Sequence, residues 1–179
     1  MSTAPTCQVV ERRCGEFLIS TDPALLDLNV IHGFLTNCYW AKGISLELVA
    51  RSIQHSLCFG IYDESTEKPP RLGSRHGAPE SRKMPEPVQV GFARVVSDFA
   101  TVAYLGDVFV LESHRGRGLS KRLMECIMQH PALQGLRRWI LLTRDAHGLY
   151  QQSGFTALAA PERYMEKHSA DVYEVRKTI

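Results

Sequence analysis

The stretch GDVFVLESHRGRGLSKRLMECIM, residues 106–128, decides the fold, because it joins an apolar run to a helical pattern through a short basic turn. The apolar run ends a predicted strand over residues 101–112, which is rich in β-branched and aromatic side chains. After the turn, apolar residues recur at helical spacing and predict an amphipathic helix over residues 118–130, with one face made of Leu119, Leu123, Met124, Ile127 and Met128. The sequence therefore predicts a strand, a loop and a helix in succession.

The loop at residues 115–120 has the composition of an anion site. Gly116 and Gly118 permit close approach of a ligand, and the first N–H groups of the following helix have no partner within that helix. Arg115 and Arg117 add positive charge, although arginines are equally at home on any hydrated surface. From these residues alone three interpretations stay open: a phosphate cradle, a nucleic-acid patch, or the basic start of a surface helix.

Residue spacing excludes two well-known nucleotide loops. A Walker loop needs four residues between its glycines, and one residue separates Gly116 from Gly118. A dinucleotide fingerprint needs a third glycine at position 121, where this chain has Lys121. The loop is therefore neither a P-loop nor a Rossmann turn.

The rest of the chain predicts an α+β or α/β domain around one mixed sheet with helices, spanning residues 1–179. Asp22 and Pro23 predict the start of a helix that ends near Asn37, and Ser45 caps a second one. Helices are expected at 23–37, 45–56, 118–130 and 146–154, and strands at 16–20, 57–63, 88–98, 101–112, 137–143 (buried), 155–159 and 162–167. The strands at 88–98 and 101–112 should form an antiparallel pair. Residues 64–87 contain five prolines and predict an insertion that cannot order itself.

Bulk composition excludes several classes of protein. The formal charge is +2, from 21 basic and 19 acidic residues, which gives no strong global field for nucleic acid or an anionic membrane. Five cysteines without a CxxC pair argue against both a disulfide framework and a zinc cluster. No apolar run is long enough to span a bilayer, and no signal peptide is visible. We expect a cytoplasmic protein that binds neither nucleic acid nor membrane and needs no metal.

Two motifs together resemble the GNAT superfamily of N-acetyltransferases. The family's pyrophosphate loop has Arg or Gln, two free residues, Gly, one free residue, and Gly or Ala; this chain has Arg115, Gly118 and a small Ser120 in those places. The segment LYQQSGF, residues 149–155, matches the family's YxxxGF segment. The resemblance covers nearly the whole chain except the Pro-rich insertion. It implies the GNAT acyl-CoA N-acyltransferase fold, a mixed, mostly antiparallel sheet flanked by helices.

The resemblance implies acetyl-CoA as the acetyl donor. Its pyrophosphate would bind the backbone amides of Arg115, Gly116, Arg117, Gly118, Leu119 and Ser120. Its pantetheine arm would pair with Val108, Phe109 and Val110, where a splay from the strand at 137–143 opens a channel. Thr143 stands where the family commonly has an asparagine that contacts this arm, and its hydroxyl can still bond there.

The resemblance also implies the reaction. A neutral primary amine would attack the thioester directly through a tetrahedral intermediate, stabilised by the N–H of Val108. Tyr150 would be the general acid for the leaving thiolate, unless it is only a core aromatic. The amine must lose a proton to a base or through a water chain, and Asp107, a carboxylate in an apolar strand, is the candidate general base. Alternation along the strand also allows Asp107 to point away and pair structurally.

The acceptor is placed by resemblance near the loop between the first two helices. Tyr39 and Trp40 could wall a cationic or aromatic group, and Asn29 and His32 could face the same cavity, or all four could simply pack. We expect a small-molecule amine. The alternatives are a protein or peptide acceptor, or a CoA-binding sensor without catalysis. The sequence leaves the oligomeric state open, a homodimer included.

Overall fold

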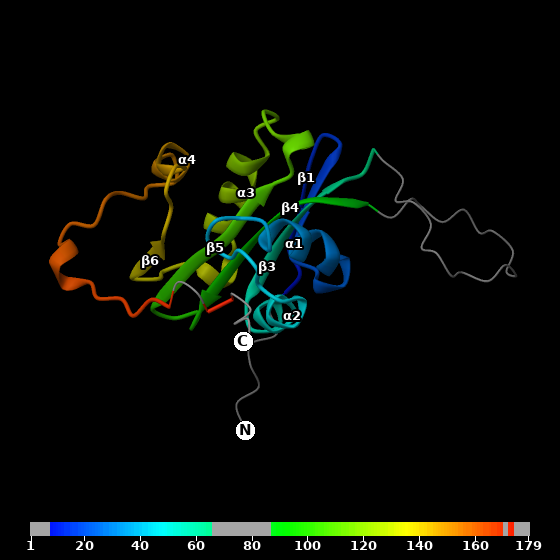
Figure 1. Cartoon of the computed structure of the whole chain (residues 1–179). Coiled ribbons are helices and arrows are strands. Elements are labelled where there is room, and N and C mark those ends of the chain that lie inside the picture. Colours follow the sequence, from blue (N-terminus) through cyan, green and yellow to red (C-terminus); the bar gives the residue numbers. More distant parts are fainter. Residues whose placement is uncertain (1–7, 66–86, 170–171, 174–179) are drawn as a thin grey trace, which may run out of the picture.

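A computed structural model describes residues 8–65, 87–169 and 172–173 (Figure 1). Its centre is a six-stranded sheet in which the strands lie in chain order: β1 (Glu11–Cys14), β2 (Phe17–Ser20), β3 (Leu57–Asp63), β4 (Val88–Ser97), β5 (Val102–Val110) and β6 (Arg138–Leu141). All neighbouring strands are antiparallel except β5 and β6, which are parallel. The predicted mixed, mostly antiparallel sheet is confirmed.

Helices cover both faces of this sheet (Figure 1). One face carries α1 (Leu28–Leu35) and α2 (Leu46–Gln54), and the other carries α3 (Leu119–Met128). The short helix α4 (His147–Gln151) follows β6. One-turn 3₁₀ helices lie at Pro23–Leu25, Glu112–His114, Pro131–Leu133 and Pro161–Arg163.

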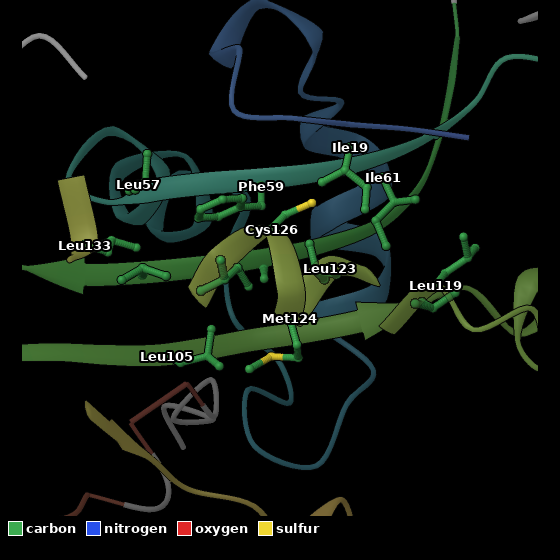
Figure 2. Close-up of a cluster of buried hydrophobic side chains, with 14 of the residues drawn as sticks. Ile19, Leu57, Phe59, Ile61, Leu105, Leu119, Leu123, Met124, Cys126 and Leu133 are labelled. Carbon is green, nitrogen blue, oxygen red and sulfur yellow. The ribbon is translucent and has the colours of Figure 1, made fainter. Parts of the chain in front are cut away.

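Each face has its own apolar cluster, because successive side chains of a strand point to opposite faces. Strand β3 is buried along its whole length: Phe59 and Ile61 pack toward α3, and Cys58 packs toward α1 and α2. Figure 2 shows the α3 side, where Leu123 and Met124 of α3 pack against the face of the sheet. The core is thus centred on β3, β4 and β5, the strands that carry the candidate site.

Local sequence signals set the ends of several elements. Ser45 accepts a hydrogen bond from the N–H of Leu48 and begins α2, as predicted. The turn between β4 and β5 is built by Asp98, whose carboxylate accepts hydrogen bonds from the backbone N–H groups of Ala100, Thr101 and Val102. The hydroxyl of Thr101, which donates to Oδ2 at 2.6 Å, and then these backbone bonds hold the pKa of Asp98 far below its usual range. The predicted antiparallel pair therefore forms around a turn that its own residues specify.

The first helix begins later than predicted. Asp22 does cap a helical turn, but this turn is the 3₁₀ helix Pro23–Leu25, and Leu26 returns to extended backbone. The α-helix begins at Leu28, with Asp27 accepting hydrogen bonds from two N–H groups of its first turn. The amide of Asp27 is in turn bound by Gln89 from β4 at 2.6 Å. This bond to a distant strand fixes the second start, which local spacing could not indicate.

Other predictions about the sheet are wrong. Strand β1 was not predicted, because its residues ERRC are polar and mostly exposed. The strands expected at 155–159 and 162–167 do not form: the first is irregular, and a 3₁₀ turn overlaps the second. Strand β6 is half-buried at the sheet edge rather than buried. The Pro-rich insertion predicted at 64–87 lies almost wholly outside the described residues. No helix in the described part of the chain is both long and apolar enough to cross a membrane.

Candidate active site

Strands β5 and β6 form a fork. They pair only from Val102 to Leu105 on β5, opposite Arg138 to Leu141, and the ladder stops there. In Figure 1 the chain that follows β6 runs away from β5 toward α4. The second half of β5 is therefore paired on one side only, by β4. The splay expected between these strands is present.

The free side of β5 offers backbone donors. The N–H of Leu111 donates to Val90 of β4 at 2.8 Å, so it points toward β4. Since N–H groups alternate along a strand, those of Val108 and Val110 point the other way, into the fork. Val108 is half-buried, while the side chains of Phe109 and Val110 are buried in the core. The structure thus presents the backbone of 108–110 to the fork and not its side chains.

A β-bulge interrupts β5 directly before Val108. Phe92 pairs with Phe109 and Arg94 with Gly106, so three steps along β5 oppose two along β4. The bulge contains Asp107, whose φ of 55° lies in the left-handed region that few non-glycine residues adopt. The bulge turns the Asp107 carboxylate to the face that carries α1 and α2.

Both oxygens of the Asp107 carboxylate have partners there. Oδ2 lies 2.7 Å from Nε of Arg94, and Oδ1 accepts a hydrogen bond from the indole N–H of Trp40 at 3.2 Å. Arg94 also donates to the hydroxyl of Ser56 at 3.3 Å. Only 13% of the Asp107 side chain and 20% of the Arg94 side chain are exposed, so this is a largely buried ion pair. The sequence left open that Asp107 pairs structurally, and the structure contains such a pair, with Arg94.

The glycine loop leads from β5 into α3 as predicted. Gly116 and Gly118 have φ of 78° and 73°, and an added Cβ would meet nothing within 4 Å at either position. Gly118 caps α3 with no side-chain hydrogen bond. Open space beside an uncapped helix N-terminus, where the macrodipole is positive, is what an anion requires.

The arginines of the loop are directed toward the protein. Nε of Arg115 donates to the carbonyl of Val110 at 3.2 Å and ties the loop to the end of β5. Arg117 pairs with Glu16 at 3.1 Å and lies over the ring of Phe17 at 5.8 Å, both from the β1–β2 region. These side chains shape the loop, and its backbone remains the part that faces open space.

Tyr150 lies on α4 and is 8% exposed. Its ring packs edge-on against Phe155 and belongs to the cluster on the α3 side, which is the core position that the sequence left open. Burial raises the pKa of Tyr150 above its ordinary value, and interactions with Tyr39, Asp145 and Tyr104 raise it further. The hydroxyl therefore stays protonated at neutral pH, as a proton donor must.

The predicted acceptor residues Tyr39 and Trp40 lie together, with their rings edge to face at 4.9 Å. Trp40 reaches β5 through Asp107, while the Tyr39 hydroxyl accepts the N–H of Arg144, just beyond β6, at 3.3 Å. The Arg144 guanidinium lies 3.9 Å from the centre of the Tyr39 ring. The loop between α1 and α2 therefore touches both sides of the fork.

The other predicted contacts fare differently. His32 bonds the carbonyl of Ile44 through Nε2 at 3.1 Å and braces the loop from α1 to α2. Asn29 is exposed in the first turn of α1, and none of the contacts found in the described residues joins it to Trp40 or Asp107. Thr143 accepts the N–H of Ala146 at 3.0 Å, within the turn that leads into α4. His32 and Thr143 thus have structural bonds, and their expected ligand contacts stay predictions.

Sequence reasoning missed Arg94 and Arg144. Arg94 had a usable signal, since a charged residue in the apolar run 88–98 needs a buried partner, the same argument that singled out Asp107. Arg144 had none, because its contact with Tyr39 joins residues 105 positions apart.

A strand fork that leads into a glycine loop at a helix N-terminus suits a ligand with an extended arm and an anionic end. A family model described as an acetyltransferase (GNAT) domain matches residues 86–157. A protein from Gibberella zeae named as a candidate acetyltransferase is 33% identical over 141 residues, which cover 76% of each chain.

Solved structures agree. A crystal structure from Xanthomonas campestris pv. campestris, named as a candidate acetyltransferase of the GNAT family, is 48% identical, with a TM-score of 0.74 and coverage of 89% of this chain and 97% of that one. The fold alone is shared with a predicted acetyltransferase from Clostridium acetobutylicum, solved with acetyl-CoA: 11% identity, TM-score 0.52, and coverage of 89% and 96%. The chain belongs to the GNAT family of acetyltransferases.

Proposed function

We propose that this protein is an N-acetyltransferase that transfers the acetyl group of acetyl-CoA to a primary amine of a small molecule. The observation that carries the proposal is the continuity of the fork, the bulge at Asp107 and the uncapped glycine loop along one edge of β5. Family membership supports the acetyl transfer, and the donor, acceptor and mechanism are the proposal itself.

The residues along this edge fit acetyl-CoA. The backbone amides of 115–120, beside the open space at Gly116 and Gly118, would hold the pyrophosphate. The outward N–H of Val110 would donate to a carbonyl of the pantetheine arm, which leaves the N–H of Val108 for the reacting carbonyl. When bound, acetyl-CoA supplies an activated acetyl thioester. The structure in Clostridium acetobutylicum that contains acetyl-CoA supports the choice of ligand through its fold.

Three groups of the chain have proposed chemical roles. The Val108 N–H, fixed by the bulge, would stabilise the negative charge that develops on the carbonyl oxygen. Tyr150, whose raised pKa keeps its hydroxyl protonated, would donate a proton to the leaving sulfur. Asp107 is the carboxylate beside Val108, and its proposed role is to accept a proton from the amine.

The loop between α1 and α2 supports a small acceptor. Trp40 is bonded to Asp107 on one side of the fork, and Tyr39 to Arg144 on the other. A loop that touches both sides leaves less room than the open groove that a peptide needs. Residues Tyr39 and Trp40 are 49% and 41% exposed, so their rings can still pack against a small amine.

The test is thiol release from acetyl-CoA across a panel of alkyl amines, amino acids, aryl amines and peptides, with CoA binding measured by calorimetry. Turnover confined to one class of small amine supports the proposal and names that class. Turnover with peptides alone would show that the acceptor is a peptide and not a small-molecule amine. CoA binding without turnover would favour a sensor, and absence of CoA binding would remove the proposed donor.

A further inference from the structure

A buried carboxylate lies beneath the glycine loop, outside the groups used above. Asp63 is the last residue of β3 and is 3% exposed, with Phe17 of β2 and Val88 of β4 as its strand neighbours. Burying a carboxylate costs free energy unless donors surround it. Its partners therefore show what the charge is used for.

Asp63 is bonded to the segment that enters the loop. Oδ1 accepts hydrogen bonds from the hydroxyl and the N–H of Ser65, at 2.6 and 2.8 Å. Oδ2 lies 3.3 Å from Nε2 of His114, the residue directly before Arg115. Because a carboxylate only accepts, Nε2 carries the proton of this bond. Burial raises the pKa of Asp63, but the bonds from Ser65 and then His114 outweigh it, so the pKa is lowered.

His114 is held on its other sides as well. Its Nδ1 lies 2.8 Å from the hydroxyl of Ser113, and its ring packs edge-on against Phe17 at 6.2 Å. Only 18% of its side chain is exposed. His114 also closes the 3₁₀ turn at Glu112–His114, which sets the direction in which the chain enters Arg115.

The glycines of the loop make this support necessary. Gly116 and Gly118 have no side chains to pack, and a Cβ atom added at either position would meet nothing within 4 Å. Glycine also leaves the backbone more conformations than any other residue. The loop amides therefore need an external support to point in one direction before a ligand arrives.

We propose that Asp63 and His114 are positioning residues for acetyl-CoA: the buried carboxylate holds the imidazole, and the imidazole fixes the backbone of residues 115–120 in the conformation that binds the pyrophosphate. The proposal rests on the proposed function, since it names the support of that same binding loop. Neither side chain touches the reacting atoms. Their loss should weaken CoA binding because a smaller fraction of molecules has the competent loop.

Calorimetric titration of CoA into the full chain tests the proposal. We expect Asp63→Asn and His114→Leu each to raise the Kd for CoA about tenfold. This factor corresponds to the free energy of roughly one charge-assisted hydrogen bond. His114→Gln should stay near the wild type, because its amide can still donate to Asp63. The double variant should be no weaker than either single one, since the two residues act as a unit.

Two further measurements separate positioning from simple stability. Glu64→Gln is the matched control: this neighbour pairs with exposed Arg13, not with the loop, and its Kd should not change. Amide hydrogen exchange should quicken in peptides covering 112–120 and stay unchanged in β3 and β4. If Asp63→Asn does not fold, the comparison of His114→Leu with His114→Gln decides alone.

Unchanged CoA affinity in both Asp63→Asn and His114→Leu, with only lower thermal stability, would overturn the positioning role and leave the proposed function intact. Absence of CoA binding by the wild type would instead overturn the proposed function, and the inference with it.

Discussion

Asp107 and Arg94 form a largely buried ion pair, 2.7 Å from carboxylate to guanidinium, at the bulge where β5 has one residue more than β4. The pair links the unusual backbone of Asp107 to the strand opposite. Because Val108 follows directly, the direction of its N–H depends on this bulge. The same contact therefore stabilises the fold and orients the proposed oxyanion donor.

Asp107→Asn should lower the free energy of unfolding by about 2 kcal/mol, because it leaves the Arg94 guanidinium half-paired in a largely buried place. Asparagine tolerates the left-handed backbone at φ 55°, so the loss reports the charge and not strain. Urea unfolding measures it. The Arg94→Met and Asp107→Asn double variant should lose clearly less than the two single losses added together, and simple additivity would refute the coupling.

The same Asp107→Asn variant tests the proposed base. If Asp107 accepts the proton of the amine, kcat/KM should fall by about 100-fold or more in Asp107→Asn and much less in Arg94→Met, which keeps the carboxylate. If the carboxylate only holds the bulge, the two variants should lose similar activity, because both break the same ion pair. Steady-state assays with the amine found by the panel distinguish the two.

Tyr150→Phe should reduce kcat by about 100-fold while the Kd for CoA stays the same, because only the proton donor is removed. The pKa of Tyr150 is raised by burial, so the wild-type rate should not decline between pH 8 and about 10, the ordinary tyrosine pKa. Tyr164→Phe, at an exposed tyrosine, is the control. A Tyr150→Phe enzyme with nearly full kcat would make Tyr150 a core residue only.

The strand–loop–helix unit was predictable because its signals are local. The apolar run, the glycines and the helical spacing of Leu119, Leu123 and Ile127 each act over a few residues. Strand β1 gave no such signal, since its polar residues form a strand only because β2 pairs with it. The sequence predicted the start of the first helix at Asp22, but α1 begins after Asp27, whose N–H donates to the distant Gln89.

The site was predictable in its backbone and not in its side-chain partners. Family motifs placed the loop, the fork and Tyr150, all of which follow chain order. The ion pair of Asp107 with Arg94 and the bond of His114 to Asp63 join residues 13 and 51 positions apart. No spacing rule encodes such contacts, because strand register and the bulge determine them.

Gly118→Ala should destabilise the protein by about 1–2 kcal/mol and weaken CoA binding, because alanine disfavours φ of 73° although nothing obstructs its methyl group. Gly118→Asn should cost less in stability, since asparagine adopts this conformation more readily. Gly33→Ala is the matched control: this glycine lies within α1, its Cβ would also meet nothing, and its replacement should stabilise by about 0.5–1 kcal/mol. Thermal unfolding and calorimetry measure both effects. Equal stability of the two alanine variants would contradict the conformational argument.

Stability should fall below about pH 6.5 because of His130, which is 2% exposed. Its Nδ1 accepts the N–H of Ala132, and its Nε2 has no partner among the described residues. Burial lowers the pKa of His130, so below pH 6.5 the unfolded chain binds a proton that the folded chain does not. The contribution of His130 to stability is complete above pH 6.5. As the pH falls below 6.5, this contribution is lost at up to about 1.4 kcal/mol per pH unit, until the pH reaches the pKa of His130 in the folded protein. His130→Asn keeps an acceptor for Ala132 but cannot titrate, so urea unfolding between pH 5 and 7.5 should show a smaller slope. Equal slopes in the two proteins would assign the acid sensitivity to other groups.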